Sequence, residues 1–223
     1  MAHADVGDLR LRIVDSETFP LDERSGYVVR PIAGRLLAVL YRDELVGRML
    51  TMSLLERAHA DSLGLPDDAM MRSALDNVSD HAVESLEVIQ VTDKCRIFVF
   101  QDEDSVLSGR MLDLPSLLAT VEDQLSKESR ASAEIGPHGV LVALPRQTLL
   151  MVFIVDGGEL IPGAATLAAN AAAHFDDDDE EAVSPWLYWV VGDEVEEMLY
   201  DVDDEGDVTE MGLPDALMAL VPA

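Results

Sequence analysis

The sequence predicts an α+β fold of mixed, mainly antiparallel strands with helix pairs between the strand blocks. Three observations support this. Apolar or alternating runs typical of strands occur as neighbouring pairs joined by brief turns, which favours antiparallel pairing. Segments with apolar residues at helical spacing are also paired, so the regular βαβ alternation of a parallel sheet is missing. Hydrophobic residues make up 48% of the chain, which is enough for a packed core despite a formal net charge of -29.

The first third is expected to hold three strands followed by two helices. In its first segment, leucine and isoleucine alternate with arginine, which is the pattern of a strand with one buried face. Ala33-Gly34 is expected to be the turn of an antiparallel pair. Gly64 marks the end of the first helix and Pro66 the start of the second. The expected strands are residues 9–14, 27–31 and 35–41, and the expected helices are residues 51–63 and 66–78.

The middle of the chain repeats this order. Thr92 to Lys94 is expected to be the turn of a second strand pair, whose weak alternation indicates burial on both faces. Leu117, Leu118, Val121 and Leu125 then follow helical spacing. The expected strands are residues 88–91 and 96–100, the expected helices are residues 104–111 and 115–125, and residues 126–137 are expected to form a loop or a frayed helix end.

The last third contains the strongest predicted hairpin, at residues 140–144 and 148–155. Pro145 cannot donate a hydrogen bond to a sheet, so we expect it at the end of the hairpin. Residues 162–174 are rich in alanine, and such small side chains allow a helix to approach its neighbour closely. Strands are expected at residues 187–191 and 196–202, a turn at 203–207, and a short terminal helix from Pro214.

The length of 223 residues allows one large domain or two small, closely packed ones. We expect an N-terminal α+β part over residues 1–137 and an acidic C-terminal α+β part over residues 138–223, packed together as one unit.

The charge is distributed unevenly along the chain. No lysine or arginine follows Arg146, whereas nineteen of the forty-four acidic residues do. DNA, RNA and anionic membrane surfaces are therefore excluded as partners, and basic proteins are favoured. Two explanations of the acidity remain open. The acids either form a surface matched to a cationic partner, or they reflect a salt-rich cytoplasm that screens carboxylates over a Debye length of about 3 Å at 1 M salt.

Two acidic segments are the candidate partner-binding residues. The first follows the alanine-rich helix directly, where the negative end of the helix dipole disfavours anions. It is either a solvated loop or a docking edge for a partner rich in arginine or lysine. The second resembles the start of a calcium loop, but its twelfth position is Gly212 instead of a bidentate glutamate. A hairpin turn at Glu205-Gly206 explains it better, and loose calcium binding stays an open alternative. The candidates are Asp176, Asp177, Asp178, Asp179, Glu180 and Glu181 in the first segment, and Asp203, Asp204, Glu205 and Asp207 in the second.

Motifs for chemistry are missing. The chain has no nucleophile elbow, phosphate loop, dinucleotide fingerprint or zinc spacing. His59 and His81 are possible neighbours in space, but we interpret them as surface or helix-end residues. The ten methionines either fill gaps in the core or line an adaptable groove. We name no catalytic residue, cofactor or metal site, and the sequence leaves enzymatic activity unsupported but open.

The expected compartment is a cytoplasm. Cys95, the single cysteine, excludes an intrachain disulfide and lies beside an apolar run, where a buried and inert thiol is expected. The first eight residues carry no signal-peptide pattern, and no apolar run approaches the ~20 residues of a membrane helix.

Residues Gly139 to Met151, with the sequence GVLVALPRQTLLM, resemble a strand, proline turn and strand in the YtpQ-like family of uncharacterised bacterial proteins. The order of upstream elements is also similar, so the resemblance covers residues 27–201. This chain departs from the family in its shorter N-terminal part and in its acidity. The resemblance implies a bacterial cytoplasmic α+β domain of unknown role, without a catalytic set to transfer.

The leading hypothesis is a non-enzymatic cytoplasmic module that binds a basic protein through its acidic C-terminal third, as an inhibitor, immunity-type protein or chaperone-like protein does. The alternative is a globular domain, such as a small hydrolase or a sensor, whose acidity reflects a salt-rich cytoplasm.

Overall fold

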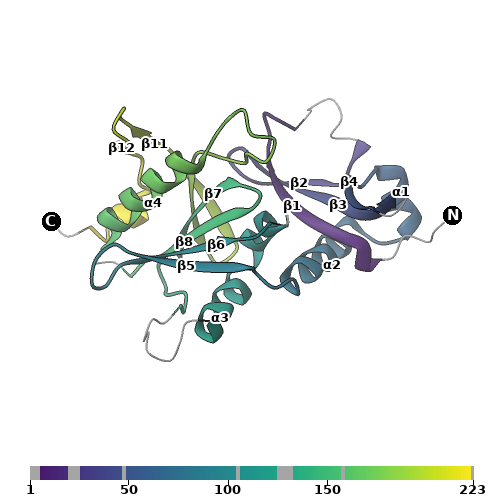
Figure 1. The fold of residues 1–223 in the computed structure, drawn as a ribbon, viewed down its shortest axis with the longest axis horizontal. Coiled ribbons are helices and arrows are strands. Elements are labelled where there is room, and N and C mark those ends of the chain that lie inside the picture. Colours follow the sequence, from purple (N-terminus) through teal and green to yellow (C-terminus); the bar gives the residue numbers. More distant parts are fainter. Residues whose placement is uncertain are drawn as a thin grey trace.

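The computed structural model describes residues 6–19, 26–46, 49–103, 106–124, 133–156 and 159–221. Over these residues the chain forms strands in antiparallel sheets together with α-helices, which confirms the predicted α+β class. Figure 1 shows a four-stranded and a six-stranded sheet side by side along the longest axis of the molecule. Among the described residues, none of the helices has the length and apolar character that crossing a membrane requires.

The four-stranded sheet is built around one long strand, β3. Leu9, Leu11 and Ile13 of β1 are buried while the residues between them are partly exposed, as the alternating sequence predicts. β1 pairs with the first half of β3, and β2 pairs with that half as well. The strands are β1 (Leu9–Asp15), β2 (Val29–Ala33), β3 (Leu36–Val46) and β4 (Met49–Leu54).

The helix predicted at residues 51–63 is wrong in its first half. Residues 49–54 form β4, which pairs with Tyr41 to Val46 of β3, and only α1 (Arg57–Leu63) is helical. Pairing with β4 satisfies the backbone groups of β3 beyond the end of β2. The predicted helix at 66–78 is confirmed as α2 (Asp67–Ser79).

The six-stranded sheet has the order β10-β9-β7-β8-β6-β5. Its central strands β6, β7 and β8 are buried along almost their whole length, as their continuous apolar runs predict. Pro145 lies in the last two residues of β7, at the hairpin end as expected. The strands are β5 (Ser85–Gln90), β6 (Arg96–Gln101), β7 (Val140–Arg146), β8 (Leu149–Ile154), β9 (Leu187–Val191) and β10 (Glu194–Met198).

Two apolar cores lie on the two faces of this sheet. On one face, α4 (Leu160–His174) packs against β6, β7 and β8 (Figure 1). A Cβ atom on Gly163 would lie 2.4 Å from Cζ of Phe153, so the predicted close approach of the small-residue helix is confirmed. On the other face, one core joins the four-stranded sheet, α2, α3 (Leu114–Gln124) and the 3-10 helix η3 (Leu107–Asp113). The six-stranded sheet thus contains strands from both sides of residue 137.

Further boundaries also differ from the predictions. The strand predicted at 88–91 begins at Ser85, because the whole of β5 pairs with β6. The helix predicted at 104–111 is the 3-10 helix η3, with residues 104 and 105 outside the described residues. The strand predicted at 196–202 divides at Leu199 into β10 and β11 (Tyr200–Val202), because the chain leaves β9 and pairs with β12 (Val208–Met211). In the loop predicted at 126–137, residues 133–137 form neither helix nor strand, and residues 126–132 lie outside the described residues.

Candidate functional site

The first acidic segment forms a turn between α4 and β9, hereafter the acidic turn (Asp176–Glu181). Oδ1 of Asp176 accepts the backbone N–H of Asp178 at 3.1 Å, and Oδ1 of Asp179 accepts that of Glu181 at 2.9 Å. The carbonyl of Glu181 accepts the backbone N–H of Gln147 at 2.8 Å, which fastens the turn to the β7–β8 hairpin. The turn is therefore built into the fold, and four of its carboxylates are exposed: Asp176, Asp177, Asp178 and Glu180.

Arg146 supplies the positive charge that the end of α4 requires. Its Nε donates to the carbonyl of His174 at 2.9 Å, in the last turn of α4, and lies 3.3 Å from Oδ2 of Asp179. Arg12 adds a second cation near the turn. Burial lowers the pKa of Arg12, and the charges of Tyr41 and Glu181 oppose that shift. Arg146 and Arg12 thus interact with Asp179 and Glu181, whereas no ion pair with a described cation engages the four exposed carboxylates of the turn.

The second acidic segment is the tip of a hairpin, hereafter the acidic hairpin (residues 201–207), which confirms the predicted turn at Glu205-Gly206. Asp203 organises it, because its Oδ1 accepts the backbone N–H groups of Glu205 at 3.0 Å and Asp207 at 2.9 Å. Gly206 takes a φ of 87°, a conformation that favours glycine. Asp204, Glu205 and Asp207 extend into solvent, whereas the carboxylate of Asp203 serves the turn itself. The strands that this hairpin joins, β11 and β12, contact α4.

The arginines in the described part of the chain are engaged within the protein. Six of them form ion pairs with carboxylates, and the others donate to backbone carbonyls or side-chain amides. The ion pairs are Arg10 with Asp43, Arg30 with Asp68, Arg35 with Asp15 and Glu17, Arg42 with Glu44, Arg57 with Asp67, and Arg146 with Asp179. The other donors are Arg12 to Gln147, Arg72 to Asp68, Arg96 to Gln90, and Arg110 to His81.

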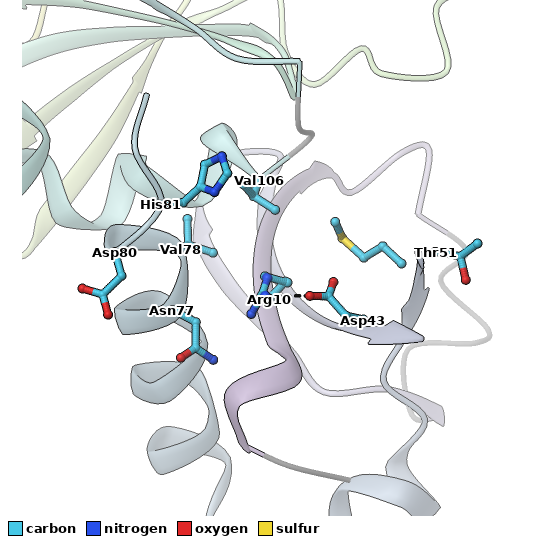
Figure 2. A pocket seen from close by; sticks show the side chains of 9 residues that line it. Arg10, Asp43, Thr51, Asn77, Val78, Asp80, His81 and Val106 are labelled. Atoms are coloured by element: carbon cyan, nitrogen blue, oxygen red, sulfur yellow. Dashed lines mark ion pairs between the residues drawn. The ribbon is translucent and has the colours of Figure 1, made fainter. Parts of the chain in front are cut away.

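A cavity of about 480 Å³ lies between α2 and the four-stranded sheet. Figure 2 shows Asn77, Val78 and Asp80 on one side, Thr51 on the other, and Arg10 with Asp43 between them. Nη2 of Arg10 lies 2.6 Å from Oδ2 of Asp43, and its Nη1 donates to backbone carbonyls. Because the donors of Arg10 bind the protein's own acceptors, the charge of this guanidinium serves the packing of β1 and β3.

Two buried charged residues, Asp102 and Arg110, contact His81 at the edge of this cavity. Nε2 of His81 lies 3.4 Å from Oδ2 of Asp102, whose side chain is only 1% exposed. Arg110 is also buried; its Nη1 donates to the carbonyl of His81 at 3.0 Å, and its Nε has no hydrogen-bond partner among the described residues. Burial lowers the pKa of Arg110. The nearby carboxylates oppose this shift, and that of Asp113 has the largest opposing effect. This cluster joins η3 to the segment after α2.

The two histidines that the sequence placed on the first helix and after the second, His59 and His81, have different partners. His59 contacts the guanidinium of Arg42, with Nδ1 at 3.0 Å, while His81 pairs with Asp102. Cys95 is buried, as predicted, and burial raises the pKa of its thiol to about 11. Within the described ranges, no three His, Cys, Asp or Glu side chains are grouped so as to hold a metal ion. The sequence reasoning missed the roles of Arg146 and Asp203, although the position of Arg146 as the last cation of the chain was a usable signal.

Comparison with known proteins gave no match to a family model, a curated protein or a solved structure. The resemblance to the YtpQ-like family stays a prediction.

Proposed function

We propose that this protein is a non-enzymatic cytoplasmic module that binds a basic protein through the acidic turn and the acidic hairpin. An inhibitor, an immunity-type protein or a chaperone-like protein directed at a nuclease or another basic protein fits this description. The proposal includes a bacterial source and membership of the YtpQ-like family, which the residue pattern at 139–151 favours.

One observation carries the proposal: the arginines that the structure describes are engaged within the protein, while most acids of the acidic turn and the acidic hairpin stand in solvent. Asp176, Asp177, Asp178 and Glu180 stand on a turn whose backbone is fixed by its own hydrogen bonds. A backbone that is already held in place loses little conformational freedom when a cationic surface approaches the carboxylates it carries. Such a surface accelerates association with a cationic partner and makes the rate sensitive to salt.

The test compares two variants with equal charge change. The turn variant carries Asp176→Asn, Asp177→Asn, Asp178→Asn and Glu180→Gln. The control variant carries Glu56→Gln, Asp61→Asn, Asp76→Asn and Asp93→Asn, at exposed acids elsewhere. Each protein is immobilised on a support and incubated with an extract of the source cells. The basic proteins retained at low and at high salt are identified by mass spectrometry.

We expect the original protein and the control variant to retain the same basic protein at low salt and to release it at high salt. The turn variant should retain about tenfold less of it, since four charges are lost from one contact surface. Equal retention by the two variants, or retention that salt does not change, would overturn the proposal.

A second candidate function has its own supporting observation, because exposed acids also occur far from the turn. Asp61 on α1, Asp76 on α2, Glu87 on β5 and Asp93 in the β5–β6 turn all lie in solvent. This spread fits a globular domain, such as a small hydrolase or a sensor, adapted to a salt-rich cytoplasm. That candidate predicts that both variants gain the same stability at low salt.

A further inference from the structure

A second cavity, of about 350 Å³, lies at one end of the six-stranded sheet, beside the C-terminal end of α4. Its floor is formed by three residues that are paired across neighbouring strands. Ser85 of β5 is paired with Gln101 of β6, and Gln101 is paired with Leu149 of β8. Thr148 and His174 complete the wall. Arg146 connects this cavity to the acidic turn, since it lines the cavity and forms an ion pair with Asp179.

The cavity has an excess of negative charge. Among the described residues that line it, Glu84, Asp102 and Glu103 carry carboxylates and Arg146 carries a guanidinium. That guanidinium is directed at the carbonyl of His174 and the carboxylate of Asp179. The last carbonyls of the fifteen-residue helix α4 add partial negative charge at the same end. A cation is therefore favoured here over an anion.

The floor offers neutral acceptors in addition to charge. The side chains of Ser85, Gln101 and Thr148 make no hydrogen bond with other residues that the structure describes, and each carries an acceptor oxygen. Leu149 provides an apolar surface between them. A ligand that fits has several N–H donors on a cationic head and an apolar stem, which is the composition of an arginine side chain.

We propose that this cavity receives an arginine side chain of the basic partner. The inference rests on the proposed function and adds the point at which the partner is anchored. The guanidinium would donate to Gln101, Ser85 or Thr148 and face the carboxylates of Glu84 and Glu103. The partner's surface next to that arginine would then lie against the acidic turn.

The direct test is a titration of the ¹⁵N-labelled full chain with Nα-acetyl-arginine amide, followed by NMR. Nα-acetyl-citrulline amide, which has nearly the same shape without the charge, is the matched probe. We expect saturable shifts at the backbone amides of Gln101, Thr148 and Leu149 with the arginine derivative, and at least about fivefold weaker binding of the citrulline derivative. Absence of these shifts, or equal binding of both probes, would overturn the inference.

A pair of variants distinguishes binding in this cavity from attraction by the overall negative charge of the protein. Glu84→Gln with Glu103→Gln should weaken binding of the arginine derivative by about three- to tenfold. The matched control, Asp61→Asn with Asp76→Asn, should leave it within about twofold. Equal weakening by the two pairs would show a non-specific attraction and contradict the site. The NMR spectrum of each free variant verifies that it is folded.

The failure of this inference can be told apart from the failure of the proposed function. If the arginine derivative produces no shifts while the turn variant still loses its basic partner, the cavity inference falls and the proposed function stands. If the turn variant retains the partner at low salt, the proposed function falls, whatever the titration shows.

Discussion

At the scale of single residues, the side chain of Gln147 connects the two sheets. Its Oε1 accepts Nε–H of Arg12 at 3.1 Å and the hydroxyl of Ser108, and its Nε2 donates to the carbonyl of Ile13. The residue is only 3% exposed. Buried polar groups of this kind stabilise a unique packing when all are satisfied and are costly when one partner is removed.

Gln147→Ala should lower the free energy of unfolding by about 2–4 kcal/mol, because it leaves the buried carbonyl of Ile13 without a donor and the buried hydroxyl of Ser108 without an acceptor. Urea denaturation followed by circular dichroism measures the change. Gln101→Ala, at an exposed position on the same sheet, is the control and should change stability by less than about 0.5 kcal/mol. Similar losses for the two variants would refute a linking role for Gln147.

Cys95 leads to a prediction about reactivity and pH. Burial, with Glu159 and Asp156 nearby, raises the pKa of its thiol to about 11 from an ordinary 9.0. The thiolate is the reactive form, so the folded protein should resist iodoacetamide at pH 8, and the protein in guanidinium chloride should react fully. Because the pKa is raised by folding, the thiol's contribution to stability is present below pH 9 and is lost as the pH rises towards 11. Rapid alkylation of the folded chain at pH 8 would contradict the burial of Cys95.

At the scale of elements, the packing of α4 rests on Gly163. Gly163→Ala would raise intrinsic helix propensity, yet the added Cβ would meet the ring of Phe153 at 2.4 to 2.8 Å. The overpacking should win and destabilise the protein by about 1–3 kcal/mol. Differential scanning calorimetry decides the sign, since a higher melting temperature would mean that α4 can move away from β8 at no cost.

Elements with a strong pattern were predictable from the sequence, and elements defined by a distant partner were not. The alternation of β1, the apolar runs of β7 and β8, and the alanines of α4 are local signals that tertiary packing reinforces. The run Met49 to Leu54 is short and fits helical and strand spacing alike, so only its pairing with β3 decides it as β4. Leu199 gives no local sign that the chain leaves one sheet there and starts another.

The candidate site shows the same division. The acidic turn and the acidic hairpin were predicted as segments, because each is a run of aspartate and glutamate that the local sequence shows. In the hairpin, Gly206 also indicates a turn. The cavity beside α4 was not predicted. It combines Ser85, Gln101 and Leu149 from three strands, and the order β8-β6-β5 in the sheet depends on non-local pairing.

At the scale of the whole molecule, the net charge of -29 must act against the compact state. The N-terminal half offsets part of its acidity with ion pairs such as those of Arg10, Arg35 and Arg57, whereas Arg146 is the last cation of the chain. Self-repulsion should therefore be greatest around the last third. Salt relieves it, because the Debye length falls from about 30 Å at 0.01 M to about 3 Å at 1 M.

The melting temperature should accordingly rise by about 5 °C between 0.01 M and 1 M sodium chloride. The turn variant should melt higher than the original protein at 0.01 M salt and gain less from 1 M salt, because its four neutralised acids have no lysine or arginine after them in the chain. The control variant should show a smaller effect, because Asp61 lies near Arg57, whose pKa is raised first by its hydrogen bond to Asp67 and to a lesser degree by the charge of Asp61. Equal effects of the two variants would favour acidity as an adaptation of the whole surface to salt. A larger effect of the turn variant would locate the repulsion where the basic partner is proposed to bind, and the partner's charge would then replace salt as the stabilising counterion.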